Sequence, residues 1–242
     1  FITATGISGT NATAINQLVL DLKTANIWTK MKCIYPFVGN TSASQKYNLK
    51  DPRDLDAAYR LTFTGGVTFS ANGCQPNGVN GYANTFLIPA TSLSANSSHA
   101  SIYNRTAGSG TINDWGTSGG GLAFSAAIYL SGSAYLDCYN SSTNRIATAN
   151  ASATGFYVGS RTSSTSLKLF KNGTQIGTTN TSASVGVAGL TADVKLFSYN
   201  PVQNLSNREC AFASFGDGLT DAEVTAFRTA VQLFNTTLSR NV

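Results

Sequence analysis

An apolar stripe at helical spacing predicts a helix near the start of the chain. The stripe consists of Ile15, Leu18, Val19 and Leu22, and Thr10 can cap the segment that carries it. A stripe of this kind usually packs against a core, so we expect an accessory helix docked on the main body of the fold. Residues 31–37 then read as a first strand that ends at Pro36.

From residue 50 onward the pattern shortens to a period of two, which is typical of strands. The segment 59–63 alternates, turns at Gly65-Gly66 and resumes over 67–69. Further strand candidates are 81–88, 98–105, 122–130, 133–139, 154–160, 166–171, 174–178, 193–199 and 208–215. Many short strands separated by Gly, Asn and Ser clusters predict a sandwich or barrel of antiparallel sheets. The glycine-rich segment 108–121 is expected to be the largest loop.

Two local signals are well specified. Asn172-Gly173 supplies the positive φ angles of a type I′ turn, which predicts a hairpin between 166–171 and 174–178. Thr220 and Glu223 have the spacing of a capping box at the start of an amphipathic helix over 220–238. We therefore expect an N-terminal helical region over 1–36 and a β-rich region over 37–242 that ends in this helix.

Composition reduces the number of function classes that this chain can belong to. Only 11% of the 242 residues are charged, whereas 79 are Ser, Thr or Asn. The net charge is +5, from 16 Lys and Arg against 11 Asp and Glu residues. The basic residues are scattered rather than clustered, and this argues against nucleic-acid binding. No apolar run is long enough to span a bilayer, so membrane insertion is not expected. The chain begins at Phe1 without a signal peptide, which suggests a fragment or a processed product.

The four cysteines, Cys33, Cys74, Cys138 and Cys210, are widely spaced and form no CxxC motif. Zinc binding is therefore not expected. Cys138 and Cys210 lie in strand-like segments, where a buried free thiol acts as a small apolar side chain. Disulfide pairing stays open at this point.

The order of elements near the C-terminus resembles the concanavalin A-like, laminin-G-type jelly rolls. The resemblance covers roughly residues 154–230 and rests on the Lys-Asn-Gly hairpin, the late strand 210–215 and the Leu-Thr-Asp-Ala-Glu helix start at 219–223. It implies an antiparallel β-sandwich, or jelly roll, with helices at both ends.

The segments 27–32, 35–37 and 48–56 are similar to uncharacterised phage virion proteins that carry a lectin-like domain. This resemblance implies a structural or adhesive component of the virion surface. Other virion proteins and bacterial surface glycans are then the expected partners, and a homo-oligomer is left open. A purely architectural role without sugar binding is the alternative.

The chain has few of the side chains that serve in acid–base catalysis. Its only Glu residues, Glu209 and Glu223, lie in no glycosidase motif, and its only His, His99, lacks a Gly-x-Ser-x-Gly elbow. We therefore predict that the chain is not an enzyme; depolymerisation of a surface polysaccharide is the least favoured alternative. Asp114, Asp137 and Asp217 are isolated, so no metal site is predicted, although a calcium ion is left open.

Sugar recognition uses aromatic faces beside amide, hydroxyl and Arg groups. Such residues occur together in Tyr103-Asn104-Arg105, in Asn113-Asp114-Trp115, in Tyr139-Asn140 and at Arg161. The predicted glycan-binding residues are Tyr103, Arg105, Asp114, Trp115, Tyr139, Asn140 and Arg161. The alternative for each is a packing role: Trp115 can fill the edge of the core, and the tyrosines can cover apolar surface.

Overall fold

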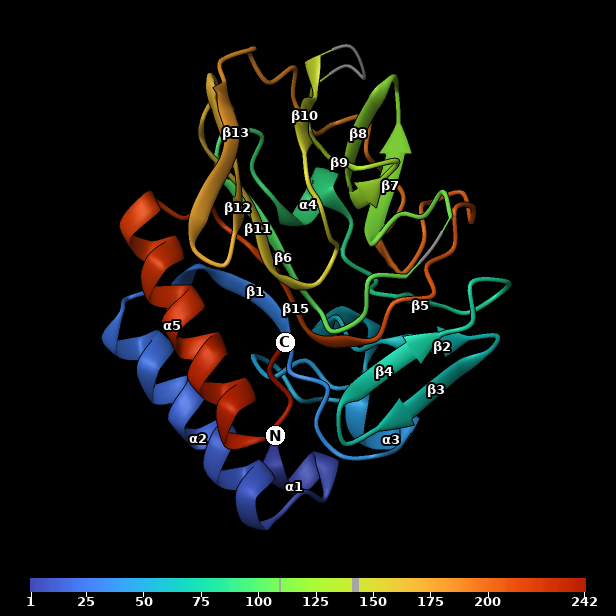
Figure 1. Ribbon diagram of the computed structural model, residues 1–242, viewed down its shortest axis with the longest axis vertical. Helices are drawn as coiled ribbons and strands as arrows, with labels where there is room; N and C mark the ends of the chain where they lie inside the picture. Colours follow the sequence, from blue (N-terminus) through green and yellow to red (C-terminus); the bar gives the residue numbers. More distant parts are fainter. Residues whose placement is uncertain (109, 141–143) are drawn as a thin grey trace.

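The computed structural model describes residues 1–108, 110–140 and 144–242, whose strands form two antiparallel sheets (Figure 1). The eight-stranded sheet contains β1 (Met31–Tyr35), β3 (Val67–Ser70), β4 (Gly73–Pro76), β6 (Ser98–Asn104), β11 (Gly155–Ser163), β12 (Ser166–Lys171), β13 (Thr174–Asn180) and β15 (Cys210–Gly216). The seven-stranded sheet contains β2 (Thr62–Thr64), β5 (Tyr82–Asn84), β7 (Trp115–Gly119), β8 (Leu122–Leu130), β9 (Ser133–Cys138), β10 (Ile146–Ala149) and β14 (Lys195–Leu196).

In both sheets, strands that are far apart in the sequence lie next to each other. The eight-stranded sheet runs β13-β12-β11-β6-β15-β4-β3, with β1 also paired to β15, and the seven-stranded sheet runs β10-β9-β8-β7-β14-β5-β2. The chain is therefore a mainly β antiparallel sandwich with helices near both ends, as the sequence predicts.

Between the sheets lies a core of alternating inward-facing side chains. Trp115 packs on Phe124 with ring centroids 4.7 Å apart, and on Phe215 at 5.7 Å. These three residues come from β7, β8 and β15, so they join the two sheets. Burial of such large aromatic side chains is the main source of stability for a sandwich of this size.

The helices are α1 (Ile2–Thr5), α2 (Gly9–Thr24), α3 (Ser42–Gln45), α4 (Pro89–Ser92) and α5 (Asp221–Thr237), with 3₁₀ turns at Trp28–Lys30 and Asp56–Ala58. Two of them, α2 and α5, cover the face of the eight-stranded sheet that points away from the other sheet. The two long helices, α2 and α5, lie side by side on one flank of the molecule (Figure 1). Leu18 and Leu22 of α2 and Phe227 of α5 join Phe156 and Phe212 of the sheet in a second apolar cluster. The central strands β6, β11 and β15 of the eight-stranded sheet thus contribute side chains to both clusters and are buried on both faces.

The local sequence signals are confirmed. Asn172 and Gly173 adopt φ angles of 50° and 83° between β12 and β13, as a type I′ turn requires. Thr220 and Glu223 form the reciprocal capping box of α5. All four cysteines are buried and free. The predicted cap of the first long helix is wrong by two residues, because α2 begins at Gly9 and Ser8 occupies the cap position.

Strands form on both sides of Gly65-Gly66, as predicted, and β2 joins the seven-stranded sheet whereas β3 joins the eight-stranded one. Two other predictions need correction. The predicted loop 108–121 contains β7, which pairs with β8 and β14. The predicted strand 193–199 is reduced to two residues, Lys195–Leu196. In both cases pairing within the seven-stranded sheet, rather than local pattern, decides the outcome.

The outer face of the seven-stranded sheet is the more open side of the sandwich. Ala147 and Ala149 of β10 are exposed there, and Tyr135 of β9 is partly exposed. Among the described residues, no helix combines the length and apolar character needed to cross a membrane.

Candidate functional site

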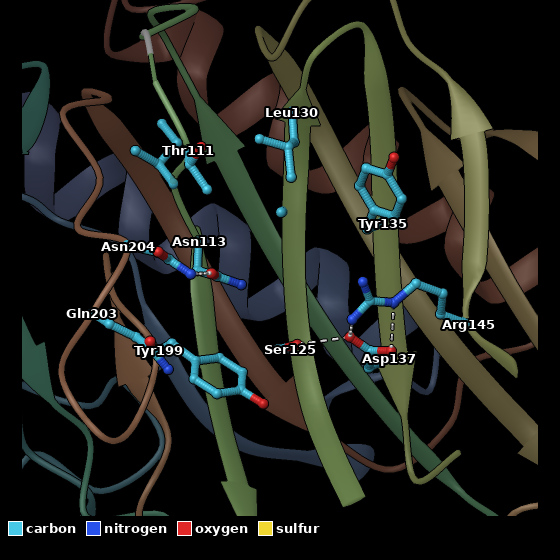
Figure 2. A pocket seen from close by; sticks show the side chains of 12 residues that line it. Thr111, Asn113, Ser125, Leu130, Tyr135, Asp137, Arg145, Tyr199, Gln203 and Asn204 are labelled. Atoms are coloured by element: carbon cyan, nitrogen blue, oxygen red, sulfur yellow. Dashed lines mark hydrogen bonds and ion pairs between the residues drawn. The ribbon is translucent and has the colours of Figure 1, made fainter. Parts of the chain in front are cut away.

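A polar pocket of about 170 Å³ opens on the outer face of the seven-stranded sheet (Figure 2). Its floor comes from β8 and β9, and its walls come from the loops that precede β7 and follow β14. The lining residues are Thr111, Ile112, Asn113, Ser125, Ala127, Leu130, Tyr135, Asp137, Arg145, Tyr199, Gln203 and Asn204.

Strand alternation puts the floor residues on one face. In β8 and β9, Phe124, Leu136 and Cys138 point into the core, so Ser125 and Asp137 between them point outward. Ser125 is the direct cross-strand partner of Asp137, and the next pair on the same face of the sheet is Ala127 with Tyr135. The sheet register therefore places a hydroxyl, a carboxylate and an aromatic ring side by side.

Asp137 and Arg145 form the charged part of the pocket. Arg145 donates through Nε to Asp137 Oδ1 at 3.0 Å and through Nη2 to Oδ2 at 2.6 Å, and Ser125 Oγ donates to Oδ2 at 3.1 Å (Figure 2). The Asp137 side chain is only 3% exposed, whereas that of Arg145 is 36% exposed. The hydrogen bonds from Arg145 to Asp137 raise the pKa of the guanidinium. Such a fork-shaped pair holds both side chains in a fixed orientation.

Two aromatic rings flank this ion pair. The Arg145 guanidinium lies 5.5 Å from the centre of the Tyr135 ring, within the range of a cation–π contact. Tyr199 lies on the opposite side of the pocket (Figure 2), and burial raises the pKa of its phenol. The site therefore offers aromatic surface on two sides of a polar floor.

The amide-rich rim is held by bonds between two loops. The Asn113 amide donates to the Asn204 carbonyl at 2.8 Å, and Asn204 Nδ2 donates to Asn113 Oδ1 at 3.1 Å. The Tyr199 amide donates to the Gln203 carbonyl at 3.2 Å, which closes the second loop on itself. Because each loop is tied down, the rim amides are oriented before any ligand arrives.

The residues predicted to bind glycans lie elsewhere. The side chains of Tyr103, Asp114, Trp115, Tyr139, Asn140 and Arg161 are all buried. Trp115 packs in the core, and Tyr139 stacks on Phe124 at 5.2 Å. The structure thus gives both rings the packing role that the sequence left as the alternative.

The predicted polar residues are engaged internally. Asp114 accepts from Arg208 Nη1 at 2.7 Å, and both side chains are 1% exposed. Arg161 donates through Nη2 to Asn140 Oδ1 at 2.6 Å, which ties the end of β9 to β11.

Two of the residues predicted to bind glycans, Tyr103 and Arg105, instead hold the C-terminal end of the chain in place. Tyr103 donates its hydroxyl to the Val242 carbonyl at 3.3 Å. Arg105 is partly exposed, pairs with Glu209 and donates through Nε to the Arg240 carbonyl at 2.8 Å.

The lone histidine is also internal. His99 Nδ1 lies 2.6 Å from the Asp217 carbonyl, and Nε2 lies 3.2 Å from Ser214 Oγ. Burial lowers the pKa of His99 to about 4. His99 is fully buried and its ring contacts Phe227 of α5, so no substrate reaches this Ser–His pair. His99 therefore has a structural role in the interior.

The lining residues of the pocket are largely ones that the sequence did not single out. Asn113 borders the predicted Asp114-Trp115 motif, and the sequence presents Asp137 as an isolated carboxylate. Among the described residues, no group of three or more His, Cys, Asp or Glu side chains could hold a metal ion. The available signal was the alternation of polar and apolar residues in β8 and β9, which marks an outward polar row without showing that a pocket forms there.

The fold matches solved carbohydrate-related β-sandwich structures at low sequence identity. Domain 4 of AbnA, a GH43 extracellular arabinanase from Geobacillus stearothermophilus solved with arabinotriose, has a TM-score of 0.57 and 14% identity over 82% of this chain and 98% of its own. A botulinum neurotoxin type C structure, from work on cell entry through two ganglioside molecules, has a TM-score of 0.56 and 10% identity over 88% of this chain and 53% of its own.

A mutant Trypanosoma rangeli sialidase with trans-sialidase activity has a TM-score of 0.56 and 12% identity over 90% of this chain and 38% of its own. This chain thus spans about half of the neurotoxin chain and well under half of the sialidase. No family profile matches the sequence, and no curated protein matches it. At these identities the likeness establishes the β-sandwich fold.

Proposed function

We propose that this chain is a non-enzymatic glycan-binding domain and that the pocket between Tyr135 and Tyr199 is its sugar site. The observation that carries the proposal is the composition of the pocket, in which aromatic surface lies beside amides, a hydroxyl and a bidentate ion pair. A sugar has apolar CH patches and many hydroxyls, so it needs both kinds of surface. The volume is below the ~300–1,000 Å³ of sites that bury a drug-sized ligand, which suits a single sugar unit.

Binding without catalysis fits the carboxylates of the site. Hydrolysis of glycosides usually needs two carboxyl groups facing the bond. Asp137 is the one carboxylate among the described lining residues, and Arg145 and Ser125 occupy both of its oxygens. The arabinotriose and ganglioside named for the neighbouring structures support sugar binding as the use of this fold.

The cellular role that we propose is adhesion to host-surface glycans from the surface of a virion. It is supported by the resemblance of segments 27–32 and 48–56 to phage virion proteins. Weak sites of this size gain avidity when several copies are displayed together. Other virion proteins are the expected structural partners, and the proposal requires no resident cofactor or metal.

A glycan array followed by calorimetric titration of the purified chain tests this proposal. Tyr135→Ala removes one aromatic wall and should weaken glycan binding by at least about fivefold, as truncation of a central aromatic contact does. Tyr82→Ala is the matched control, because Tyr82 is also a partly exposed tyrosine of the seven-stranded sheet but lies outside the pocket. A folded protein that binds no glycan, but binds another virion protein tightly, would instead establish the architectural role.

A further inference from the structure

The pocket carries no unpaired charge among its described lining residues. Asp137 and Arg145 are its only charged side chains, and they neutralise each other through two hydrogen bonds. The remaining polar groups are hydroxyls and amides, which can both donate and accept. A ligand therefore meets a surface of mixed donors and acceptors with no free cation.

An acidic sugar that takes Arg145 as its own bidentate partner would have to break this ion pair. Its carboxylate would compete with Asp137 for Arg145 and leave the Asp137 carboxylate buried without its partner. Leaving a buried carboxylate without its cationic partner is unfavourable, and this penalty discriminates against the ligand that causes it. A neutral sugar avoids the penalty, because its hydroxyls can bond to the rim amides while the Asp137–Arg145 pair stays intact.

We infer that the Asp137–Arg145 pair makes the pocket selective for neutral sugar units over sialic or uronic acids. This inference rests on the proposed glycan-binding function and specifies its ligand class. The ganglioside binding named for one structural neighbour is therefore not the specificity that we expect of this chain.

Calorimetric titration with matched probes tests the selectivity: arabinotriose and lactose as neutral sugars, and sialyllactose and trigalacturonate as acidic ones. We expect the acidic probes to bind at least about tenfold more weakly. Asp137→Asn should release Arg145 and shift the ratio toward acidic probes by about tenfold or more, because the guanidinium then lacks its carboxylate. Arg145→Gln leaves the carboxylate in place and should not produce this shift.

Asp221→Asn is the matched control, since Asp221 pairs with Lys168 at 2.7 Å outside the pocket. Thermal denaturation shows whether each variant is folded. If Asp137→Asn is unfolded, the ratio of neutral-probe to acidic-probe affinity of the wild type decides whether the inference holds. Equal or tighter binding of acidic probes by the wild type overturns the inference while glycan binding stands. Binding of no glycan on the array overturns the proposed function itself.

A second, independent feature concerns the cysteines. Cys74 of β4 and Cys210 of β15 are direct cross-strand partners, and both are fully buried in the core between the sheets. Directly opposed residues of an antiparallel pair have Cα atoms about 4.5–5.5 Å apart, within the ~4.4–6.8 Å that a disulfide spans. Cys33 lies opposite Phe215 and Cys138 opposite Phe124, so neither has a thiol as its partner.

We propose that Cys74 and Cys210 form a cross-strand disulfide when the chain folds under oxidising conditions. With glutathione disulfide as the oxidant, one protein thiolate attacks it to give a mixed disulfide and releases one glutathione. The second protein thiolate then displaces the second glutathione, and the Cys74–Cys210 bond forms. Burial in the folded sheet raises the pKa of both thiols and so disfavours the reactive thiolates. The exchange therefore takes place during folding, before the two strands are buried.

Refolding in a glutathione redox buffer, followed by non-reducing peptide mapping, tests this pairing. We expect one disulfide, between the peptides that carry Cys74 and Cys210, and a thermal midpoint raised by at least about 5 °C. Cys74→Ser should abolish both effects, whereas Cys33→Ser should preserve them. Native protein with four free thiols after this refolding, or any other pairing, would overturn the proposal.

Discussion

The ring of Tyr199 occupies the space that a side chain at position 116 would need. A Cβ atom on Gly116 would lie 2.5 Å from Tyr199 Cδ2 and 2.8 Å from Ser125 Cβ. The loop that carries Tyr199 is held there by the Asn200 amide, which donates to the Gly116 carbonyl at 3.2 Å. The absence of a side chain in β7 therefore decides where one aromatic wall of the pocket lies.

Gly116→Ala should push Tyr199 away from the sheet and weaken glycan binding. Because the added methyl group meets a packed ring, we also expect the variant to lose about 1–3 kcal/mol of unfolding free energy. Calorimetric titration and urea denaturation measure the two effects. Gly132→Ala is a control for glycine replacement at the surface, because nothing lies within 4 Å of a Cβ atom there, although its positive φ adds local strain. Unchanged binding by Gly116→Ala would contradict the placement of Tyr199.

Asp114→Asn should destabilise the fold strongly. The substitution leaves the Arg208 guanidinium, which is 1% exposed, without its anionic partner, and breaking a buried pair costs about 3–5 kcal/mol. Asp221→Asn is the contrasting control, because the Asp221 side chain is 63% exposed and its pair with Lys168 is worth about 1 kcal/mol or less. Equilibrium urea denaturation of both variants checks the difference, and equal losses would argue against the internal role of Asp114.

The buried His99 should make stability depend on pH. Its folded-state pKa of about 4 lies below the unfolded value of 6.5, so the unfolded chain binds the proton more readily. The contribution of the neutral ring is complete above about pH 6.5 and is lost as the pH falls toward 4, to a limit of about 3 kcal/mol.

Urea denaturation at pH 7 and pH 4.5 measures this loss, and His99→Gln should reduce the difference between the two pH values. Since the chain has a single histidine, its NMR signal reports the pKa without assignment. A measured pKa near 6.5 in the folded protein would contradict the burial of this ring.

Thr220→Ala should remove the cap of α5 and cost about 1 kcal/mol of unfolding free energy. Thr220 Oγ1 accepts from the Glu223 amide at 3.3 Å, and the Thr220 amide donates to Glu223 Oε2 at 2.8 Å. Thr225→Ala lies in the same helix and removes no cap, so we expect it to be neutral or slightly stabilising. A chemical-denaturation comparison in which both variants behave alike would show that the cap contributes nothing.

Local structure could be predicted from the sequence because its causes are local. The spacing of Thr220 and Glu223, the turn at Asn172-Gly173 and the helical stripe through Leu18 and Leu22 each act within a few residues. The scarcity of Glu and His likewise limits acid–base chemistry before any fold is known. Period-two alternation was enough to predict an antiparallel sandwich.

The binding site could not be predicted in this way, because local pattern does not show what covers a side chain. Trp115 and Tyr139 look like surface aromatics in a polar sequence, yet packing of the two sheets buries both. Asp114 looks like a loop carboxylate, but Arg208, distant in sequence, approaches it in the interior.

The sequence by itself determined most of the helices and strands, the sandwich class of the fold and the small number of side chains suited to acid–base catalysis. Only the tertiary structure decided which polar residues reach solvent and which meet. Asn113, Asp137 and Tyr199 come together because sheet register and loop packing join segments that are far apart in the chain. Register and packing depend on contacts between distant residues, so no local window of the sequence contains them.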